Sequence, residues 1–479
     1  MMVTISFNPV LPNYEYVPDV EPRLFQGRVY LYGSHDKFNG KSFCLNDYVC
    51  YSSAVDDLIS WRYEGVIYRR NQDPKPGKGL VNRMFAPDVI QGLDGRYYLY
   101  YFIGFSSRIS VAVCDEPAGQ YQFLGTVKYQ DGTPLGAKNE PLQFDPGIFI
   151  DDDQSIYLYT GFAPRSFPQI FSKGRKTTHE GAMIFKLEDD MLTIKSEVKF
   201  IAKTILNAQG TSFEGHAFFE ASSMRKFNGK YYFIYSSYVG HELCYAISDH
   251  PDQDFEFGGV LVSNGDLGLS DKALNYTGNN HGSIIKINDQ FYVTYHRHTN
   301  RHPFSRQVCV EPIMYDGVHF KQAEMTSMGF RGEPLPPSGM FDASICCHLT
   351  SKQGTFFYAK PYKQRKYWHP YLTQKGKDRN HIPNQYIAHI KDGTTIGYKY
   401  ISPGSTAIRL SLSGCAMGNI IVSKDAAGTD LLGQTKLHQC FKTSWTDIEL
   451  HHTDKIYAMY LQFRGIGTLH FHAFELITE

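Results

Sequence analysis

An apolar segment, a polar turn and an aromatic segment follow one another five times within the first 300 residues. The aromatic segments end on Tyr-Leu-Tyr or a related triplet, and they lie at residues 28–32, 96–100, 155–159, 230–235 and 290–295. Further short apolar segments follow each of them, bounded by Gly, Asn, Asp and Pro, and helical periodicity is nearly absent. Several short strands in each of five repeats predict a five-bladed β-propeller.

The repeat ends before a stretch rich in Pro and Gly at residues 331–340, which has the composition of a linker. Alternating apolar and polar positions beyond it predict strands at 407–412, 419–423 and 456–463. Such strands are typical of a β-sandwich. We therefore expect an all-β protein with a propeller over residues 1–330 and a sandwich domain over residues 341–479.

The overall charge narrows the range of partners. The 479 residues contain 48 Lys and Arg and 48 Asp and Glu, so the formal net charge is zero. A neutral chain gives no electrostatic reason to expect nucleic acid or an anionic membrane as partner. The first residues lack a basic region followed by a long apolar run, and no window approaches the ~20 apolar residues of a membrane span. A cytoplasmic location is the expectation.

Each repeat also offers one ionisable residue, ten to twelve positions before a Tyr inside its aromatic segment; these tyrosines are Tyr30, Tyr98, Tyr157, Tyr232 and Tyr292. These residues are Asp19, Asp88, Asp145, Glu220 and His281. A single Asp before a strand is usually a turn residue, but five in phase favour a ring of side chains at one mouth of the propeller channel. Neighbouring buried carboxyl groups push their pKa values apart, so one can act as a base and another as an acid. That pair suits hydrolysis of a glycosidic bond.

Five sequence motifs make a family resemblance specific. They are Asn8-Pro-Val-Leu-Pro12, Phe85-Ala-Pro-Asp88, Phe144-Asp-Pro-Gly-Ile-Phe149, Phe219-Glu-Ala-Ser222 and Asn280-His-Gly-Ser283. In this order they resemble the blade signatures of glycoside hydrolase family 43. The resemblance implies a five-bladed propeller, hydrolysis with inversion at the anomeric carbon, and α-L-arabinofuranosides or β-D-xylosides as usual substrates. Galactofuranose is a third candidate sugar, because its ring is similar to that of arabinofuranose.

The resemblance also implies roles for three carboxyl groups. Asp19 matches the general base, Glu220 the general acid, and Asp145 the carboxylate that raises the pKa of the acid and orients it. Glu21 is a weaker candidate for the base, and Glu214 lies out of phase as an acid. An inverting pair must leave room for water, so we expect the two carboxyl groups to stand ~6.5–9.5 Å apart.

Three further residues complete the predicted site. His281 resembles a channel histidine that holds water or a metal ion, often calcium, although a hydrogen-bonded core histidine is an equal alternative. Arg306 resembles an arginine near the sugar that pairs with a carboxylate, and a surface ion pair is its alternative. Asp88 has a structural or substrate-binding role. The chemistry itself needs no cofactor, and calcium in the channel would be structural.

The sandwich domain is similar, more faintly, to carbohydrate-binding module family 6. Trp368, Tyr371 and Trp445 can stack on sugar rings, but core packing is favoured for Trp445. The leading hypothesis is an exo-acting, inverting glycosidase for plant-derived oligosaccharides, with sugar choice set by loops such as residues 164–178. The rival is a non-catalytic glycan-binding propeller, against which the complete set of carboxylates argues.

Overall fold

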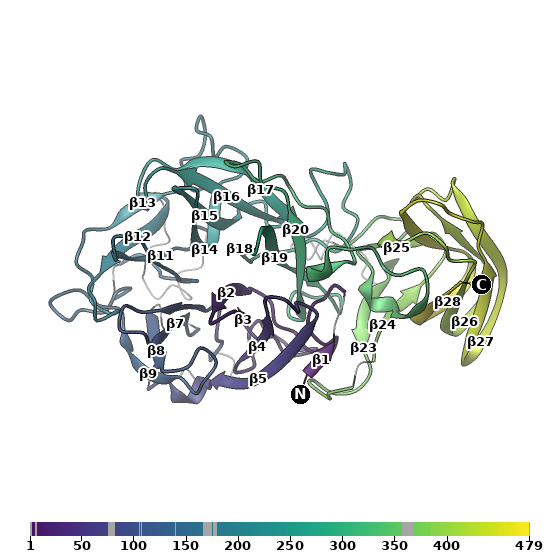
Figure 1. The fold of residues 1–479 in the computed structure, drawn as a ribbon, viewed down its shortest axis with the longest axis horizontal. Coiled ribbons are helices and arrows are strands. Elements are labelled where there is room, and N and C mark those ends of the chain that lie inside the picture. Colours follow the sequence, from purple (N-terminus) through teal and green to yellow (C-terminus); the bar gives the residue numbers. More distant parts are fainter. Residues whose placement is uncertain are drawn as a thin grey trace.

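The computed structural model of the chain describes residues 2–4, 7–74, 82–104, 106, 108–138, 140–165, 175, 180–356, 368–382 and 384–478. Strands form nearly all of its regular structure, and they divide between a propeller and a C-terminal domain beside it (Figure 1). Short helical turns occur among these residues at Arg70–Gln72, Gly329–Arg331 and Ala343–Ile345. Within the described ranges, no helix is long and apolar enough to cross a membrane.

Five antiparallel sheets form the blades of the propeller, as the repeat predicts. The first has the order β1-β5-β4-β3-β2, with β1 (Met2–Thr4), β2 (Glu21–Phe25), β3 (Arg28–Tyr32), β4 (Tyr48–Ala54) and β5 (Ser60–Tyr68). The second contains β6 (Asp88–Gln91), β7 (Tyr97–Phe102), β8 (Ile109–Cys114) and β9 (Gln122–Thr126). The third contains β10 (Gly147–Ile150), β11 (Ile156–Thr160), β12 (Ala182–Leu187) and β13 (Lys199–Ile201). The last two contain β14 (Phe218–Phe227), β15 (Lys230–Ser237), β16 (Glu242–Ser248) and β17 (Glu256–Ser263), then β18 (Ile284–Ile287), β19 (Gln290–His298) and β20 (Arg306–Ile313).

Repeated tyrosines join the first three blades to the blades that follow them. In these blades the final Tyr of the repeated phrase donates its phenolic hydroxyl to a backbone carbonyl of the following blade, whereas Tyr235 and Tyr295 bond within their own blades. These bonds are Tyr32 to Pro117 at 2.6 Å, Tyr100 to Met191 at 2.6 Å and Tyr159 to Pro251 at 2.8 Å. Each ring is buried and each hydroxyl is hydrogen-bonded, which is what a buried Tyr requires. The high tyrosine content is therefore largely structural.

The inner strands β2, β6, β10, β14 and β18 contact one another around the channel. Their register corrects one prediction. Three of these strands begin opposite the final Tyr of the repeat, in the pairs Glu21–Tyr32, Asp88–Tyr100 and Gly147–Tyr159. Asp19 and Asp145 each lie two residues before such a strand, whereas Asp88 lies on the strand at the position of Glu21. Asp88 is therefore out of phase with the other two aspartates.

The N-terminal segment closes the ring against the last blade. The backbone N–H of Val10 donates to the carbonyl of Val308 at 3.3 Å, and that of Asn8 donates to Ser327 at 3.0 Å. The Asn8 side chain exchanges two hydrogen bonds of 2.9 Å with the backbone of Val310. Residues some 300 positions apart thus meet at the β20 edge of the last blade.

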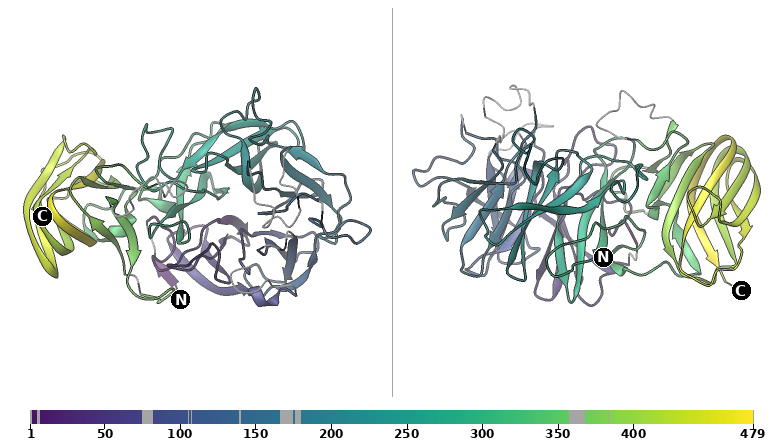
Figure 2. Two further views of the ribbon diagram at one scale, coloured as in Figure 1. Left: turned by 180° about the vertical axis from the view of Figure 1, so that it is seen from behind. Right: turned by 90° about the horizontal axis from the view of Figure 1, so that it is seen from above.

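The C-terminal domain is a sandwich-like sheet of eight strands, as predicted. They are β21 (Gly339–Asp342), β22 (His348–Thr350), β23 (Tyr371–Gln374), β24 (Gln385–Ile390), β25 (Thr394–Ile401), β26 (Ala407–Ser423), β27 (Leu431–Glu449) and β28 (Tyr457–Ile477). β28 pairs with β21, β24, β25 and β26, so one strand holds the domain together. Figure 2 shows this domain at one edge of the propeller. Trp445 is 42% exposed on β27, with Arg409 over its ring, so the preference for core packing was wrong.

Candidate active site

Asp19 is a buried carboxylate held by a cation. Its backbone has a φ of 56°, the left-handed region that Asp tolerates better than most residues, and this turn directly precedes β2. Arg306 Nη1 lies 2.8 Å from Asp19 Oδ1, and His296 Nδ1 lies 3.3 Å from the same oxygen. Burial alone would raise the pKa of Asp19, but the charge of Arg306 and the contact with His296 outweigh it and hold the pKa well below the usual range. Asp19 is therefore ionised.

Arg306 begins β20 and is itself 2% exposed, which rules out a surface ion pair. It forms a bidentate ion pair with Asp36, in which Nε lies 2.9 Å from Oδ2 and Nη2 lies 3.1 Å from Oδ1. Its guanidinium also packs over the Phe43 ring, 4.8 Å from the ring centre. This fork geometry fixes the direction of the third nitrogen toward Asp19. Sequence reasoning missed Asp36, His296 and Phe43.

Glu220 and Asp145 are two further carboxyl groups of the predicted site. Glu220 lies on β14 beside a register shift, where Ala221 has a φ of 65°, and it is partly buried. Burial, followed by the charge of Asp19, raises the pKa of Glu220 to about 8. Burial, followed by repulsion from Glu220 and Asp19, also raises the pKa of Asp145 well above the usual range. Repulsion from Glu220 thus acts on Asp145, whereas burial and Asp19 raise the pKa of Glu220, so tuning of Glu220 by Asp145 stays a prediction.

One oxygen of Asp145 is left without a partner. Among the described residues, Asp145 Oδ1 is buried and accepts no hydrogen bond. Buried polar atoms are nearly always paired, so such an atom is available to a ligand hydroxyl. Its other oxygen, Oδ2, lies 3.7 Å from Nδ1 of His281.

His281 stands between the carboxylates. Its Nδ1 also lies 4.0 Å from Asp19 Oδ1, and the side chain is buried. Burial lowers the pKa of His281 to about 4, so the ring is neutral at physiological pH. A neutral imidazole separates the ionised Asp19 from Asp145 without adding a charge.

Two ion pairs link the inner strands of different blades. Glu21 Oε2 lies 2.7 Å from Arg225 Nη2, and Asp88 Oδ1 lies 2.7 Å from Arg23 Nη2. Asp88 also accepts a backbone N–H from Ile148 at 2.9 Å, so it ties the first three blades together. These contacts give Asp88 a structural role, and its part in substrate binding stays a prediction.

The two alternative carboxylates behave differently from the predicted pair. Glu21 is committed to Arg225, and burial raises its pKa to about 7. Glu214 is exposed and accepts a hydrogen bond from the backbone N–H of Gly210 at 2.9 Å. Neither contact links these groups to Asp19 or Arg306.

The described channel residues do not fit a calcium site built from protein ligands. Ca²⁺ takes six to eight oxygen ligands and favours an excess of carboxylate. Here Arg23 and Arg225 already neutralise Asp88 and Glu21, and His281 offers a nitrogen. These residues therefore do not supply the protein ligands that calcium needs. The predicted metal ion at His281 is untested, and no step of the chemistry is assigned to it.

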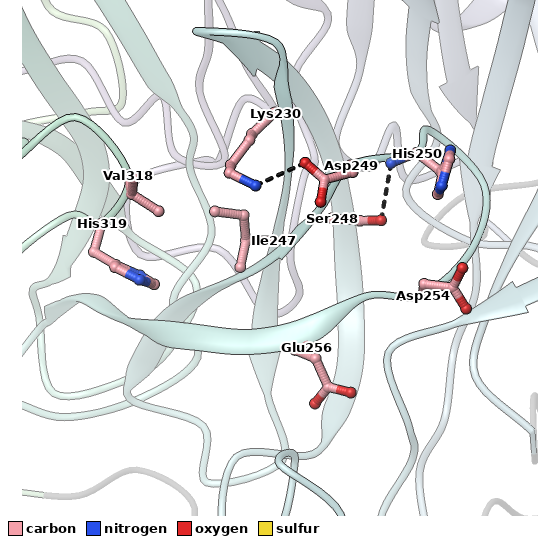
Figure 3. Close-up of a pocket in the computed structure, with 9 residues that line it drawn as sticks. All are labelled: Lys230, Ile247, Ser248, Asp249, His250, Asp254, Glu256, Val318 and His319. Carbon is pink, nitrogen blue, oxygen red and sulfur yellow. Dashed lines mark hydrogen bonds and ion pairs between the residues drawn. The ribbon is translucent and has the colours of Figure 1, made fainter.

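A hollow lined by none of these residues lies beside the fourth blade, next to strands β16 and β17 (Figure 3). Its volume is about 420 Å³. Its acidic side chains Asp249, Asp254 and Glu256 point in different directions, and Asp249 is paired with Lys230 at 2.7 Å. The hollow contains none of the predicted catalytic residues. Most of the loop 164–178 predicted to set sugar choice lies outside the described residues.

Comparison with known proteins identifies the family. The family described as "Glycosyl hydrolases family 43" matches residues 7–318. A protein of Thermoclostridium stercorarium named "Xylosidase/arabinosidase" is 46% identical over 484 residues, which cover 99% of each chain. A relative of the same name from Bacteroides ovatus is 28% identical and covers 59% of this chain and 86% of its own.

Solved structures agree with the fold. A family 43 beta-xylosidase/alpha-arabinofuranosidase from a compost metagenome, in complex with xylotriose and calcium-free, has a TM-score of 0.53 at 26% identity and covers 67% of this chain and 98% of its own. An arabinoxylan arabinofuranohydrolase of Bacillus subtilis, in complex with cellotetraose, has a TM-score of 0.50 at 19% identity and covers 98% of this chain and 97% of its own. The second likeness concerns the fold alone. On the family match and the full-length relative, this chain belongs to glycosyl hydrolase family 43 and is a glycoside hydrolase.

Proposed function

We propose that the enzyme is exo-acting and inverting, and that it releases α-L-arabinofuranosyl or β-D-xylosyl units from plant-derived oligosaccharides. One observation carries the mechanism: an ionised carboxylate, Asp19, lies near a carboxyl group with a pKa of about 8, Glu220. The two groups therefore hold the protonation states of a base and an acid at the same neutral pH. The names of the similar proteins support the choice of sugars.

In this mechanism Asp19 accepts a proton from a water molecule as the water oxygen attacks the anomeric carbon. Glu220 donates its proton to the glycosidic oxygen as the bond between that oxygen and the anomeric carbon breaks. Arg306 holds Asp19 in place, and the unpaired Oδ1 of Asp145 receives a sugar hydroxyl. The products are a free sugar of inverted configuration and the shortened chain.

A panel of aryl glycosides tests this function. Wild type and Glu220→Gln are assayed on an α-L-arabinofuranoside, a β-D-xyloside and a galactofuranoside, and proton NMR follows the anomer first formed. We expect turnover of at least one of the first two sugars, with inversion, and a large loss in the variant. Turnover of none of them by folded wild type would favour a glycan-binding propeller, and retention would refute the mechanism.

The reaction is proposed to need no metal, and a structural calcium near His281 is tested separately. Wild type is dialysed against a chelator, and its rate and melting temperature are compared with and without added Ca²⁺. A loss that only Ca²⁺ restores would place the ion in the protein.

A further inference from the structure

The second domain reaches the first blade through the loop between β23 and β24. In Figure 1 these two strands lie between the propeller and the long C-terminal strands. Asp378, in this loop, accepts a hydrogen bond of 2.6 Å from the backbone N–H of Phe38 and one of 3.0 Å from the side-chain amide of Asn46. One carboxylate of the second domain thus holds both ends of propeller segment 36–46.

Segment 36–46 surrounds the arginine that holds the base. It begins with Asp36, the bidentate partner of Arg306, and it contains Phe43, over which the guanidinium packs. Asn46 Nδ2, which donates to Asp378, also donates to the backbone carbonyl of Asp36 at 2.9 Å. A short series of contacts therefore runs from Asp378 through Asn46 and Asp36 to Arg306.

The residue next to Asp378 supports the other side of the same segment. Arg379 Nε lies 3.0 Å from Glu15 Oε1, and Glu15 Oε2 lies 3.2 Å from Nε2 of His35, which directly precedes Asp36. Glu15 and His35 are 2% and 1% exposed. A buried carboxylate needs a cation, and the propeller's Glu15 receives it partly from the second domain.

We propose that Asp378, with Arg379, is a positioning residue for the catalytic base, supplied to the propeller by the second domain. It acts by fixing segment 36–46, which aims Arg306 at Asp19. The proposal rests on the proposed function of Asp19 as the base. The second domain is then a part of the catalytic unit.

Loss of Asp378 has a defined signature. Without the two carboxylate oxygens of Asp378 that accept hydrogen bonds from Phe38 and Asn46, segment 36–46 loosens. The contact between Arg306 and Asp19 then weakens. The pKa of Asp19 is held down by Arg306, so it rises, and the acidic limb of the pH profile of kcat/KM moves to higher pH. Misplacement of the base lowers kcat by about 10- to 100-fold with a smaller change in KM.

The experiment measures kcat, KM and their pH dependence for full-length Asp378→Ala and Asp378→Asn, on the best aryl glycoside of wild type. Asp392→Ala is the matched control, because Asp392 also accepts a backbone N–H (Gly465, 3.1 Å) and contacts an amino group (Lys352, 3.4 Å), but within the second domain alone. We expect the defect of Asp378→Ala to grow as pH falls. Asp378→Asn, which keeps one acceptor, should lie between Asp378→Ala and the control.

Three results would overturn the proposal: an Asp378→Ala profile equal to that of Asp392→Ala, a change confined to KM, or a lower kcat with an unmoved acidic limb. If Asp378→Ala does not fold, Asp378→Asn and Asn46→Ala carry the same comparison. Asp19→Asn is assayed in parallel. Its inactivity combined with a normal Asp378→Ala profile refutes positioning alone, whereas wild-type activity of Asp19→Asn refutes the proposed base and this proposal with it.

Discussion

Replacing Glu220 by Gln should stabilise the enzyme at neutral pH while removing its proposed proton donor. The pKa of Glu220 is about 8 in the folded protein, against about 4.3 for an unperturbed Glu. The folded state therefore binds this proton more tightly than the unfolded state does. Wild type loses stability as pH rises from about 4.5 to about 8, by at most about 1.4 kcal/mol for each pH unit. Gln cannot ionise, so the Glu220→Gln variant does not lose stability in this way as pH rises.

The size of the effect follows from the same numbers. Between pH 5 and pH 7 wild type loses at most about 3 kcal/mol of unfolding free energy through ionisation of this group. Because Glu220 is only partly buried, solvent screens part of this electrostatic effect. We therefore expect the unfolding free energy of Glu220→Gln to gain about 1 to 2 kcal/mol over that of wild type between pH 5 and pH 7. Urea unfolding of wild type and Glu220→Gln at pH 5, 6, 7 and 8 measures it. Glu214→Gln is the control, because Glu214 is exposed.

The result that would refute the reasoning is a stability difference between Glu220→Gln and wild type that does not change with pH. In that case the carboxyl group is not held protonated by the fold. Activity gives an independent check, because the variant should retain more of its rate on aryl glycosides with good leaving groups, which need little protonation. Equal losses on good and poor leaving groups would contradict the assignment of Glu220 as acid.

Three further outcomes are expected. Asp145→Asn should lower kcat, because Oδ1 of Asp145 is proposed to receive a sugar hydroxyl; a shift of the alkaline limb of the pH profile to lower pH would support the predicted tuning of Glu220, and an unchanged rate and profile would end it. Arg225→Met should lower stability by about 3 to 5 kcal/mol in urea unfolding, because Glu21 then lacks its buried cation, and a loss below 1 kcal/mol would contradict this. Chelation should leave the rate and melting temperature unchanged, because Arg23 and Arg225 already balance the channel charge; recovery only with added Ca²⁺ would show otherwise.

The propeller could be predicted from sequence because its structural device is local and repeated. The final Tyr of each phrase recurs at the same place in its strand, and Tyr32, Tyr100 and Tyr159 each hydrogen-bond to the next blade. A side chain that recurs at a fixed position of each repeat can be recognised from the sequence alone. The same repeat singled out Asp19 and Asp145, which lie two residues before their inner strands.

The error at Asp88 has a physical cause. Positions were counted back from a Tyr, across a turn whose length differs between blades. Strands β2 and β3 are joined by two residues, 26–27, whereas β6 and β7 are joined by five, 92–96. From the final Tyr back to its partner on the inner strand there are 11 positions for Glu21–Tyr32 and 12 for Asp88–Tyr100, so a window of three allowed spacings could not separate Asp88, on β6, from a residue two positions before that strand.

Other site residues carry no sequence signal of this kind. Asp36 meets Arg306 across 270 positions, and Asp378 meets Phe38 across 340. No periodic pattern marks these residues, and each resembles an ordinary loop aspartate until the chain is folded. Their roles depend on tertiary contacts between separate blades and domains.

Closure of the ring by Asn8 and Val10 against β20 has a consequence for how activity arises during synthesis. Asp19 belongs to the first blade and Arg306 to the last, so the base has no cation until the ribosome has made nearly the whole propeller. Contacts so distant in sequence form late and slowly. We therefore expect a nascent chain that stops before residue 306 not to hydrolyse a glycoside, although it contains Asp19, Asp145 and Glu220, and we expect the onset of catalysis to report the moment at which the two ends meet.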